Sequence, residues 1–204
     1  MNKLFLQSVF AGLLIGLGGF AYLSNTVIGT FLFAFGLACV VLYKLPLFTG
    51  TAGFIDYKSV HDYLLLALVL LGNILGALLS STIALMQADN VVPVATEIIV
   101  QRSYNGIIRC FLLALGCGVV MSAAVEAARS GNSFVKWLPL VLGVPLFIQC
   151  GMVHSIADSF YFFVADLELS DYTAYIPCWI SAVFGNALGC NAYRILQAEK
   201  IEVN

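Results

Sequence analysis

Charged side chains are scarce in this chain of 204 residues. Asp, Glu, Lys and Arg make up 10% of the sequence, whereas hydrophobic residues make up 61%. A typical soluble domain is about a quarter charged and about half apolar. The composition therefore predicts an integral membrane protein. The formal net charge of −2 shows none of the basic excess that nucleic-acid-binding proteins carry, so we expect no nucleic-acid partner.

Residues that bind metals or form redox pairs are also few. The chain has two histidines and six cysteines, and no two cysteines are spaced as CxxC. All six cysteines lie within or beside apolar runs, where free thiols pack as small hydrophobic groups. A structural zinc site needs about four ligands, so we expect neither a metal nor another cofactor. The cysteines are Cys39, Cys110, Cys117, Cys150, Cys178 and Cys190.

Long apolar blocks, in contrast, fill most of the chain. About 20 apolar residues are enough to cross a bilayer, and six blocks reach that length. We expect the first block to be a span and not a cleaved signal peptide, since it lacks a small-residue cleavage site. The sequence thus predicts one all-α transmembrane domain over residues 1–204, with 87–105 as a polar break. The six blocks are residues 4–23, 28–55, 63–86, 105–127, 137–164 and 174–194.

The second and fifth blocks are too long for one plain span, and each is interrupted. The stretch KLPLFTGTAG at 44–53 contains a proline and two glycines, and QCGMVHS at 149–155 contains Gly151. Proline and glycine break helices. Broken backbone is tolerated at membrane depth only where protein or a water-filled cavity satisfies the freed polar groups. We therefore predict that helices 2 and 5 are broken.

A glycine-asparagine motif marks the third and sixth blocks. Its G-x-x-x-G spacing lets a neighbouring helix approach closely. The order of plain, broken and motif-bearing helix thus occurs twice, and three helices per half force opposite orientations. We predict two inverted repeats, about residues 4–86 and 105–194, with a transport path near the midplane where the broken helices meet. The motifs are Gly72-Asn73-Gly76 and Gly185-Asn186-Gly189.

Basic residues are distributed unevenly between the predicted loops. With six spans both termini lie on one side, and that side holds six Lys or Arg residues, whereas the other side holds only Arg102. The positive-inside rule then predicts cytoplasmic termini and a multi-pass protein of the plasma (inner) membrane. The six residues are Lys3, Lys58, Arg129, Lys136, Arg194 and Lys200.

Four ionisable groups fall inside the predicted spans: Lys44, Arg109, His154 and Asp158. Such groups cost about 2.5–3.5 kcal/mol on insertion scales and by default mark a functional site. His154 stands beside a break, where the following half-helix presents a partial positive charge that favours an anion. Because histidine titrates near neutral pH, this ring could hold a proton or exchange it with a weak-acid anion.

The other three charges have alternative roles. Asp158 lies four residues after His154 on the same helix face. It could set the charge of the histidine, face a vestibule, or pair with Lys44 or Arg109. Lys44 could attract anions at a pore mouth or extend its amine to the membrane surface. Arg109 could attract anions or form a structural ion pair.

These residues resemble the formate/nitrite transporter family of pentameric anion channels. The resemblance rests on LFTG at 47–50, CGMVHSIAD at 150–158 and the two Gly-Asn spans, and it covers about residues 10–195. It implies an aquaporin-like protomer of six spans with its own pore, assembled as a homopentamer in the lipid bilayer. It also implies that Thr49 and His154 face each other at the pore centre.

The resemblance assigns further site residues. Asn73 and Asn186 would brace the breaks or line the path, and Arg102 would replace a basic residue of the outer segment. Two positions depart from the family pattern, since Cys110 and Asp158 stand where the family usually has asparagine. The constrictions on either side of the pore centre would be Leu37, Leu47 and Phe48 on one side and Phe33 and Phe147 on the other.

The leading hypothesis is a channel for small monovalent anions of weak acids, such as formate, nitrite, hydrosulfide, acetate or lactate. A bare charge is costly between apolar rings, so a proton gained near His154 would make a neutral acid that passes. One alternative is a neutral-solute channel, although the aquaporin motif Asn-Pro-Ala is missing. The other is a membrane-embedded enzyme using His154 and Asp158. We expect no enzyme, because His61, the only other histidine, falls in a loop.

Overall fold

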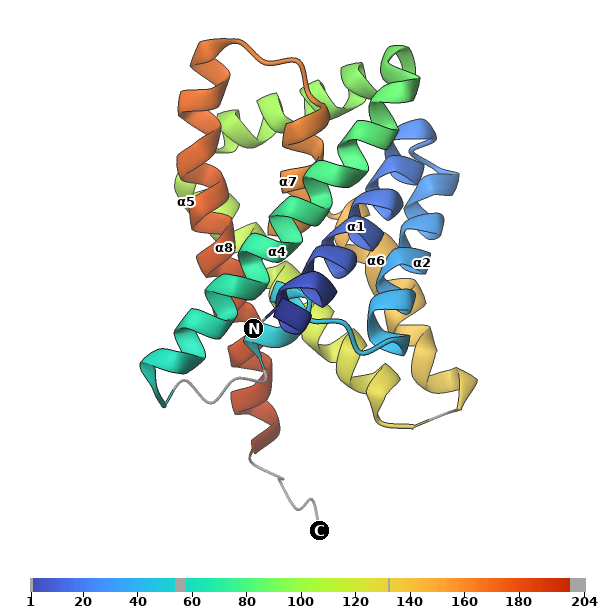
Figure 1. Cartoon of the computed structure of the whole chain (residues 1–204), viewed down its shortest axis with the longest axis vertical. Coiled ribbons are helices and arrows are strands. Elements are labelled where there is room, and N and C mark those ends of the chain that lie inside the picture. Colours follow the sequence, from blue (N-terminus) through green and yellow to red (C-terminus); the bar gives the residue numbers. More distant parts are fainter. Residues whose placement is uncertain (1, 54–57, 132, 199–204) are drawn as a thin grey trace.

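The computed structural model describes residues 2–53, 58–131 and 133–198. Within these ranges the chain forms α-helices joined by short turns, and no strand (Figure 1). α1 begins and α8 ends toward the lower end of the bundle in that view. The elements are α1 Asn2–Ser24, α2 Ile28–Leu42, α3 Phe48–Ala52, α4 Val60–Ala84, the 3-10 turn η1 Leu85–Gln87, α5 Ala88–Arg129, the 3-10 turn η2 Phe134–Trp137, α6 Leu138–Gln149, α7 Ser155–Val164 and α8 Leu169–Ala198.

Each interrupted block forms two helices. The second block contains α2 and the short α3, and the fifth contains α6 and α7. α6 ends at Gln149, and Gly151, two residues later, has a φ of 63°. This is the left-handed region that glycine adopts without steric cost. The break that the sequence predicts at residues 149–155 thus has a backbone cause.

The stretch 87–105, expected to be a polar break between spans, is helical. It forms the last residue of η1 and the first part of α5, which crosses the upper end of the bundle as a light-green helix (Figure 1). Val91, Ala95 and Ile99 are fully buried, and their spacing of four places them on one inward helix face. Gly106, with a φ of 70°, then kinks α5 into its descending part.

The helices pack in two main groups, and close backbone contacts occur within each group. α1 packs against α2 and α4, and α5 packs against α6 and α8. A Cβ atom at Gly76 would overlap the carbonyl oxygen of Val9, and one at Gly189 would overlap that of Leu115. The two G-x-x-x-G motifs therefore sit where α4 and α8 approach their neighbours too closely for any side chain.

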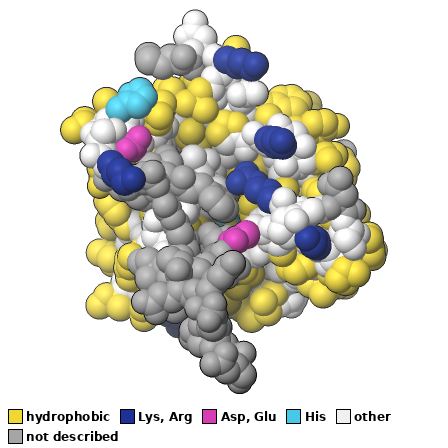
Figure 2. All heavy atoms as spheres, turned by 90° about the horizontal axis from the view of Figure 1, so that it is seen from below, with side chains coloured by type: hydrophobic (Ala, Val, Ile, Leu, Met, Phe, Trp, Pro, Cys, Tyr) yellow, Lys and Arg dark blue, Asp and Glu magenta, His cyan; other side chains and the backbone are white. Residues whose placement is uncertain are grey.

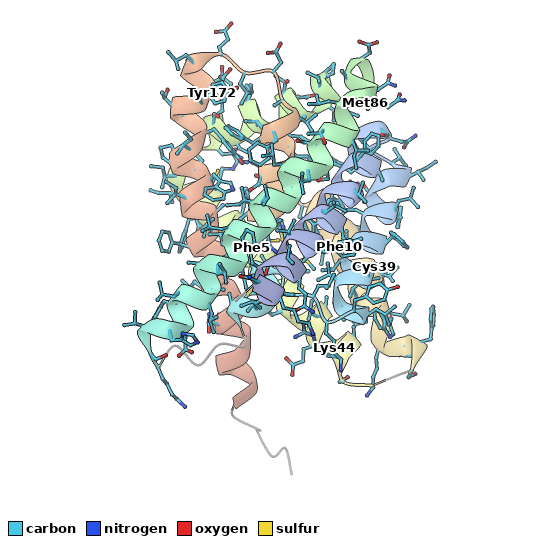
Figure 3. All side chains as sticks on the ribbon, in the orientation of Figure 1. Phe5, Phe10, Cys39, Lys44, Met86 and Tyr172 are labelled. Atoms are coloured by element: carbon cyan, nitrogen blue, oxygen red, sulfur yellow. The ribbon has the colours of Figure 1, made fainter. Side chains whose placement is uncertain are left out.

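The surface of the bundle is largely apolar. Large side chains such as Leu6, Phe35 and Phe184 are more than half exposed, and sticks of this kind cover the outside of the helices (Figure 3). By length and composition, the stretches Asn2–Ser24 and Val60–Arg129 could cross a membrane. The second stretch runs through α4, η1 and α5, and α2, α6 and α7 belong to shorter apolar helices.

Candidate functional site

The two short half-helices meet at a buried hydrogen bond. Thr49 is the second residue of α3, and His154 is the residue that caps the N-terminus of α7. The Oγ1 atom of Thr49 lies 3.1 Å from Nε2 of His154. The two residues are 1% and 2% exposed. The breaks of the second and fifth blocks, 105 residues apart, therefore come together in the protein interior.

The second nitrogen of the His154 ring is committed to the backbone. The N–H of Ala157 donates to Nδ1 of His154 over 3.2 Å, so the histidine acts as an N-cap acceptor in place of the usual Ser, Thr, Asp or Asn. An acceptor nitrogen carries no proton, which puts the proton of the neutral ring on Nε2. That N–H points at Thr49 Oγ1 and leaves the threonine hydroxyl proton available to another acceptor.

Asn73 holds the start of α3. Its Oδ1 accepts from the N–H of Phe48, the first residue of that helix, over 2.7 Å. Its Nδ2 donates to the carbonyls of Ser8 in α1 and Pro46 in the preceding loop, at 2.8 and 3.0 Å. The side chain is fully buried, and this one amide pairs with three backbone groups.

Asn186 does the same for α7. Its Oδ1 accepts from the N–H of Ser155, the first residue of α7, over 2.8 Å. Its Nδ2 donates to the carbonyls of Ala114 in α5 and Val153 in the preceding loop, at 2.8 and 2.9 Å. Asn186 is also fully buried. Each asparagine thus fixes the position of a half-helix relative to a long neighbouring helix.

Aromatic rings stand beside the histidine. Phe147 stacks on the ring of His154 with centroids 5.8 Å apart and an interplanar angle of 29°. Its other neighbour is Phe33, whose ring meets it edge-on at 5.9 Å and 88°. The structure therefore places the two rings assigned to the outer constriction in contact. The five residues assigned to the constrictions, Phe33, Leu37, Leu47, Phe48 and Phe147, are all buried in one apolar cluster.

Asp158 pairs with a residue that the sequence placed in a loop. Its Oδ2 accepts from Nε of Arg102 over 3.1 Å, whereas the sequence offered Lys44 or Arg109 as partners. Arg109 and Lys44 are exposed. The spacing rules of one helix could not reveal a contact between residues 56 positions apart. The correction follows from the fold, because Arg102 lies on the inward face of a helix and not in a loop.

Two polar pockets lie along this region. The Arg102 pocket has a volume of about 110 Å³ and includes Tyr22, Arg102, Phe147, Asp158 and Tyr161 in its lining. Cys110 donates its thiol to the carbonyl of Arg102 over 3.4 Å.

The Lys44 pocket is larger, about 540 Å³, and is lined by Lys44, Arg129, Trp137 and apolar side chains. Lys44 lies toward the lower end of the bundle, opposite the end that carries Met86 and Tyr172 (Figure 3). Several Lys and Arg side chains gather on this lower face (Figure 2). The sequence indicated Lys44 but missed Arg129 and Trp137 as its neighbours, since both fall in or beside a predicted loop.

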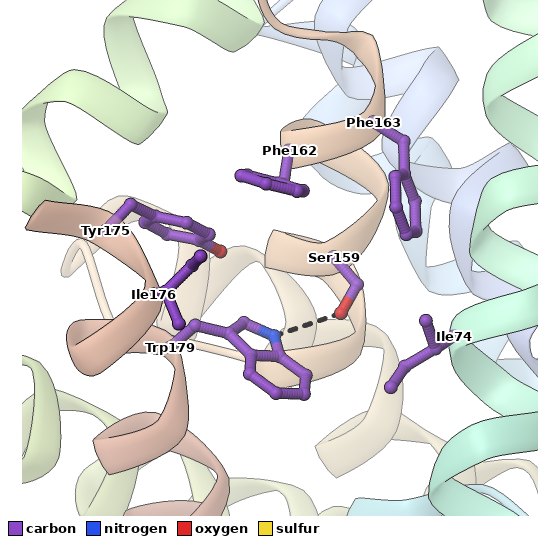
Figure 4. Close-up of a pocket in the computed structure, with 7 residues that line it drawn as sticks. All are labelled: Ile74, Ser159, Phe162, Phe163, Tyr175, Ile176 and Trp179. Carbon is purple, nitrogen blue, oxygen red and sulfur yellow. Dashed lines mark hydrogen bonds between the residues drawn. The ribbon is translucent and has the colours of Figure 1, made fainter. Parts of the chain in front are cut away.

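A third, apolar pocket lies between α4, α7 and α8 (Figure 4). Its volume is about 170 Å³. Nε1 of Trp179 donates to the hydroxyl of Ser159 and to the carbonyl of Ser155, each at 3.0 Å. This ties α8 to the first turns of the helix that begins after His154. No sequence motif pointed to it. The lining residues are Ile74, Ser159, Phe162, Phe163, Tyr175, Ile176 and Trp179.

The described part of the chain contains no cluster of metal ligands. Among the residues that the structure describes, no three His, Cys, Asp or Glu side chains cluster as metal ligands would. His154 and Asp158 face different partners, because the ring bonds to Thr49 and the carboxylate bonds to Arg102.

Two solved structures have a similar arrangement of helices. A pentameric formate channel with formate bound is 19% identical, with a TM-score of 0.78 and 97% of both chains covered. A second solved structure, described as an FNT family ion channel, is 18% identical, with a TM-score of 0.83; the match covers 97% of this chain and 89% of that one. No curated protein matches the sequence significantly. The family model for formate/nitrite transporters matches residues 1–195. The chain therefore belongs to the formate/nitrite transporter family, and the resemblance noted in the sequence is confirmed.

Proposed function

We propose that this protein is a membrane channel for small monovalent anions of weak acids, such as formate, nitrite, hydrosulfide, acetate or lactate. The observation that carries the proposal is the buried Thr49–His154 hydrogen bond, which joins the tips of two half-helices between apolar rings. The family is one of formate and nitrite transporters, and the pentameric channel of similar fold holds formate.

The passage of an anion follows from the chemistry at this point. An ion that leaves water for the space between Phe33, Phe147 and the leucines loses its hydration shell, which is costly for a full charge. At the centre, the hydroxyl of Thr49, whose oxygen accepts from Nε2 of His154, is a hydrogen-bond donor that can replace water. A proton that arrives from bulk water or through the ring converts the anion to its neutral acid. The neutral acid then crosses the second constriction.

Charge at the pore mouth draws the anion in. Lys44 and Arg129 line one pocket at the lower end of the bundle, and a cleft lined by one sign of charge raises the local concentration of counter-ions. The charge of Arg102 is compensated by Asp158, so we assign the attraction chiefly to Lys44. Arg109, exposed on α5, has no contact that assigns it a role in the path.

The assembly that we propose is a homopentamer of single-domain protomers in the plasma (inner) membrane. Each protomer spans residues 1–204 with six crossings, arranged as inverted repeats of about residues 4–86 and 105–194. The equivalent hydrogen bonds of Asn73 and Asn186 support the repeat. The Lys and Arg side chains of the face in Figure 2 support a cytoplasmic location for that face and for both termini.

The test is flux into proteoliposomes that contain the purified protein. Formate, nitrite, hydrosulfide and lactate are compared at pH 5.5 and 7.5, and the protein is tested with His154→Phe and with the control His61→Gln. We expect anion uptake that rises at the lower pH and that loses this dependence in His154→Phe alone. Passage of water or ammonia without any anion uptake would favour a neutral-solute channel, and unchanged pH dependence in His154→Phe would remove the histidine from the mechanism.

A further inference from the structure

The guanidinium of Arg102 makes three contacts on two sides of His154. Its Nε donates over 3.1 Å to Oδ2 of Asp158. Asp158 lies in α7, after the histidine. Nη1 and Nη2 of Arg102 donate to the carbonyls of Gly151 and Met152, at 2.9 and 3.3 Å, in the loop before the histidine. One side chain thus bridges the chain segments that enter and leave the pore centre.

Both ends of this bridge are mechanically coupled to the ring. The backbone N–H of Asp158 donates to the carbonyl of His154 over 2.8 Å, and the ring of His154 caps Ala157 in the same turn. The hydroxyl of Tyr175 in α8 donates to the carbonyl of Asp158. The loop before the histidine contains Gly151 and has no proline of its own, whereas the loop before α3 contains Pro46. The Arg102 contacts therefore restrict a loop that contains a glycine and no proline.

The geometry is poorly suited to direct anion binding by Arg102. All three guanidinium nitrogens donate to protein oxygens, and the residue is only 9% exposed. Its positive charge is compensated by a carboxylate that is itself 2% exposed. The planar guanidinium of arginine can donate to a carboxylate and two carbonyls at once, whereas the compact ammonium group of lysine cannot.

We infer that Arg102 and Asp158 form a clamp that positions the His154 ring, so that both are positioning residues of the channel although neither needs to touch the permeating anion. This inference rests on the proposed function for its transport consequences. Its structural part, that the pair positions the His154 ring, does not depend on which solute the protein transports. The titratable groups around the pair are Tyr22 on α1, Cys110 on α5, Tyr161 on α7 and Cys178 and Tyr175 on α8. None of these groups takes the place of Arg102 or Asp158 in the ion pair.

The first measurement needs no transport. A His61→Gln background leaves His154 as the only histidine, so that histidine labelled with ¹⁵N gives the ring signals of one residue in detergent. In this background Arg102→Lys keeps the cation but cannot hold the three acceptors together. We expect the ¹⁵N signals of the ring to shift or broaden in Arg102→Lys. Arg109→Lys, an exposed site on the same helix, should leave them at their original positions.

The second measurement is the pH profile of formate uptake in proteoliposomes. We expect Arg102→Lys to displace the profile and to lower uptake by about fivefold or more, as for coupled contacts. A role in anion attraction alone predicts near-normal uptake, because the charge is retained. If Arg102→Lys keeps both the ring signals and the pH profile, the clamp is excluded. If the native protein takes up no anion, the proposed function fails, while the ring signals still decide the clamp.

A further variant serves if the protein with Arg102→Lys does not assemble. Arg102→Met combined with Asp158→Leu removes both charges, and such replacements of buried pairs commonly keep the fold. We expect this double variant to elute from size-exclusion chromatography as the native protein does, and to show altered His154 ring signals. An assembled double variant with native ring signals and a native pH profile would overturn the inference.

Discussion

Lys44 and Gly151 occupy equivalent positions at the ends of two helices. Lys44 follows the last residue of α2 by two positions with a φ of 53°, and Gly151 follows that of α6 by two positions with a φ of 63°. Both ends have the paired hydrogen bonds of a Schellman motif, with glycine in one and lysine in the other. The bonds run from Lys44 N to Val41 O, Leu45 N to Val40 O, Gly151 N to Ile148 O and Met152 N to Phe147 O, at 2.9–3.1 Å.

Replacing Lys44 by glycine should therefore stabilise the protein and impair transport. A left-handed backbone costs an L-residue about 1 kcal/mol that glycine does not lose, so the free energy of unfolding should rise by roughly that amount. Loss of the charge in the Lys44 pocket should lower anion uptake at low ionic strength. Unfolding in detergent and proteoliposome flux measure the two effects. Lys44→Asn tolerates the backbone without the charge, so native uptake in that variant would contradict a role for the amine.

Removing either buried asparagine should destabilise the protein to a similar degree. Asn73→Ala and Asn186→Ala each leave the first N–H of a half-helix without its acceptor and remove a donor from two backbone carbonyls. An unsatisfied buried group costs about 1–3 kcal/mol, so we expect a loss of that size in each. Asn191→Ala is the comparison. Its partly buried side chain donates to the carbonyls of Ala52 and Ala187, so we expect a smaller loss than in the two buried variants. A loss in only one of the two buried variants would argue that the two braces are not equivalent.

Glycine contacts between the long helices give a third prediction. Gly76→Ala and Gly189→Ala place a methyl group onto a neighbouring carbonyl oxygen, so the helices must separate. Overpacking of this kind costs about 1–3 kcal/mol. Gly116→Ala provides the matched control on α5, because its Cβ would lie 3.6 Å from the nearest side-chain atom, in ordinary contact. In thermal unfolding, we expect lower midpoints for Gly76→Ala and Gly189→Ala than for the native protein. The midpoint of Gly116→Ala should be native-like or higher.

The sequence predicted the parts of the fold that depend on local pattern. The breaks at glycine and proline follow from residue type and spacing, as does the close approach of α4 to α1 and of α8 to α5, so these features could be predicted from the sequence. The contact between Thr49 and His154 could not be read in this way, because it joins residues 105 positions apart. That pair entered only through the resemblance to a family.

Two other features were missed for a physical reason. The first part of α5 was judged by its polarity, although its buried residues repeat every four positions, as in an amphipathic helix. In this helix Arg102 lies on the inward face and forms an ion pair with Asp158. The left-handed Lys44 was equally hidden, because sequence rules expect glycine at such a helix end.

The edge-on contact of Phe33 with Phe147 leads to the last prediction. Phe33 is 1% exposed, whereas Phe35, two residues later on α2, is 70% exposed. If the first ring narrows the path, Phe33→Ala should widen it and admit a larger anion more readily. We expect the uptake of lactate relative to formate to rise by roughly tenfold, the scale of small steric differences in apolar pockets. Phe35→Ala removes a ring of the same size from the outer surface and should leave the ratio unchanged. Equal ratios in the two variants would mean that Phe33 packs the interior without lining the path.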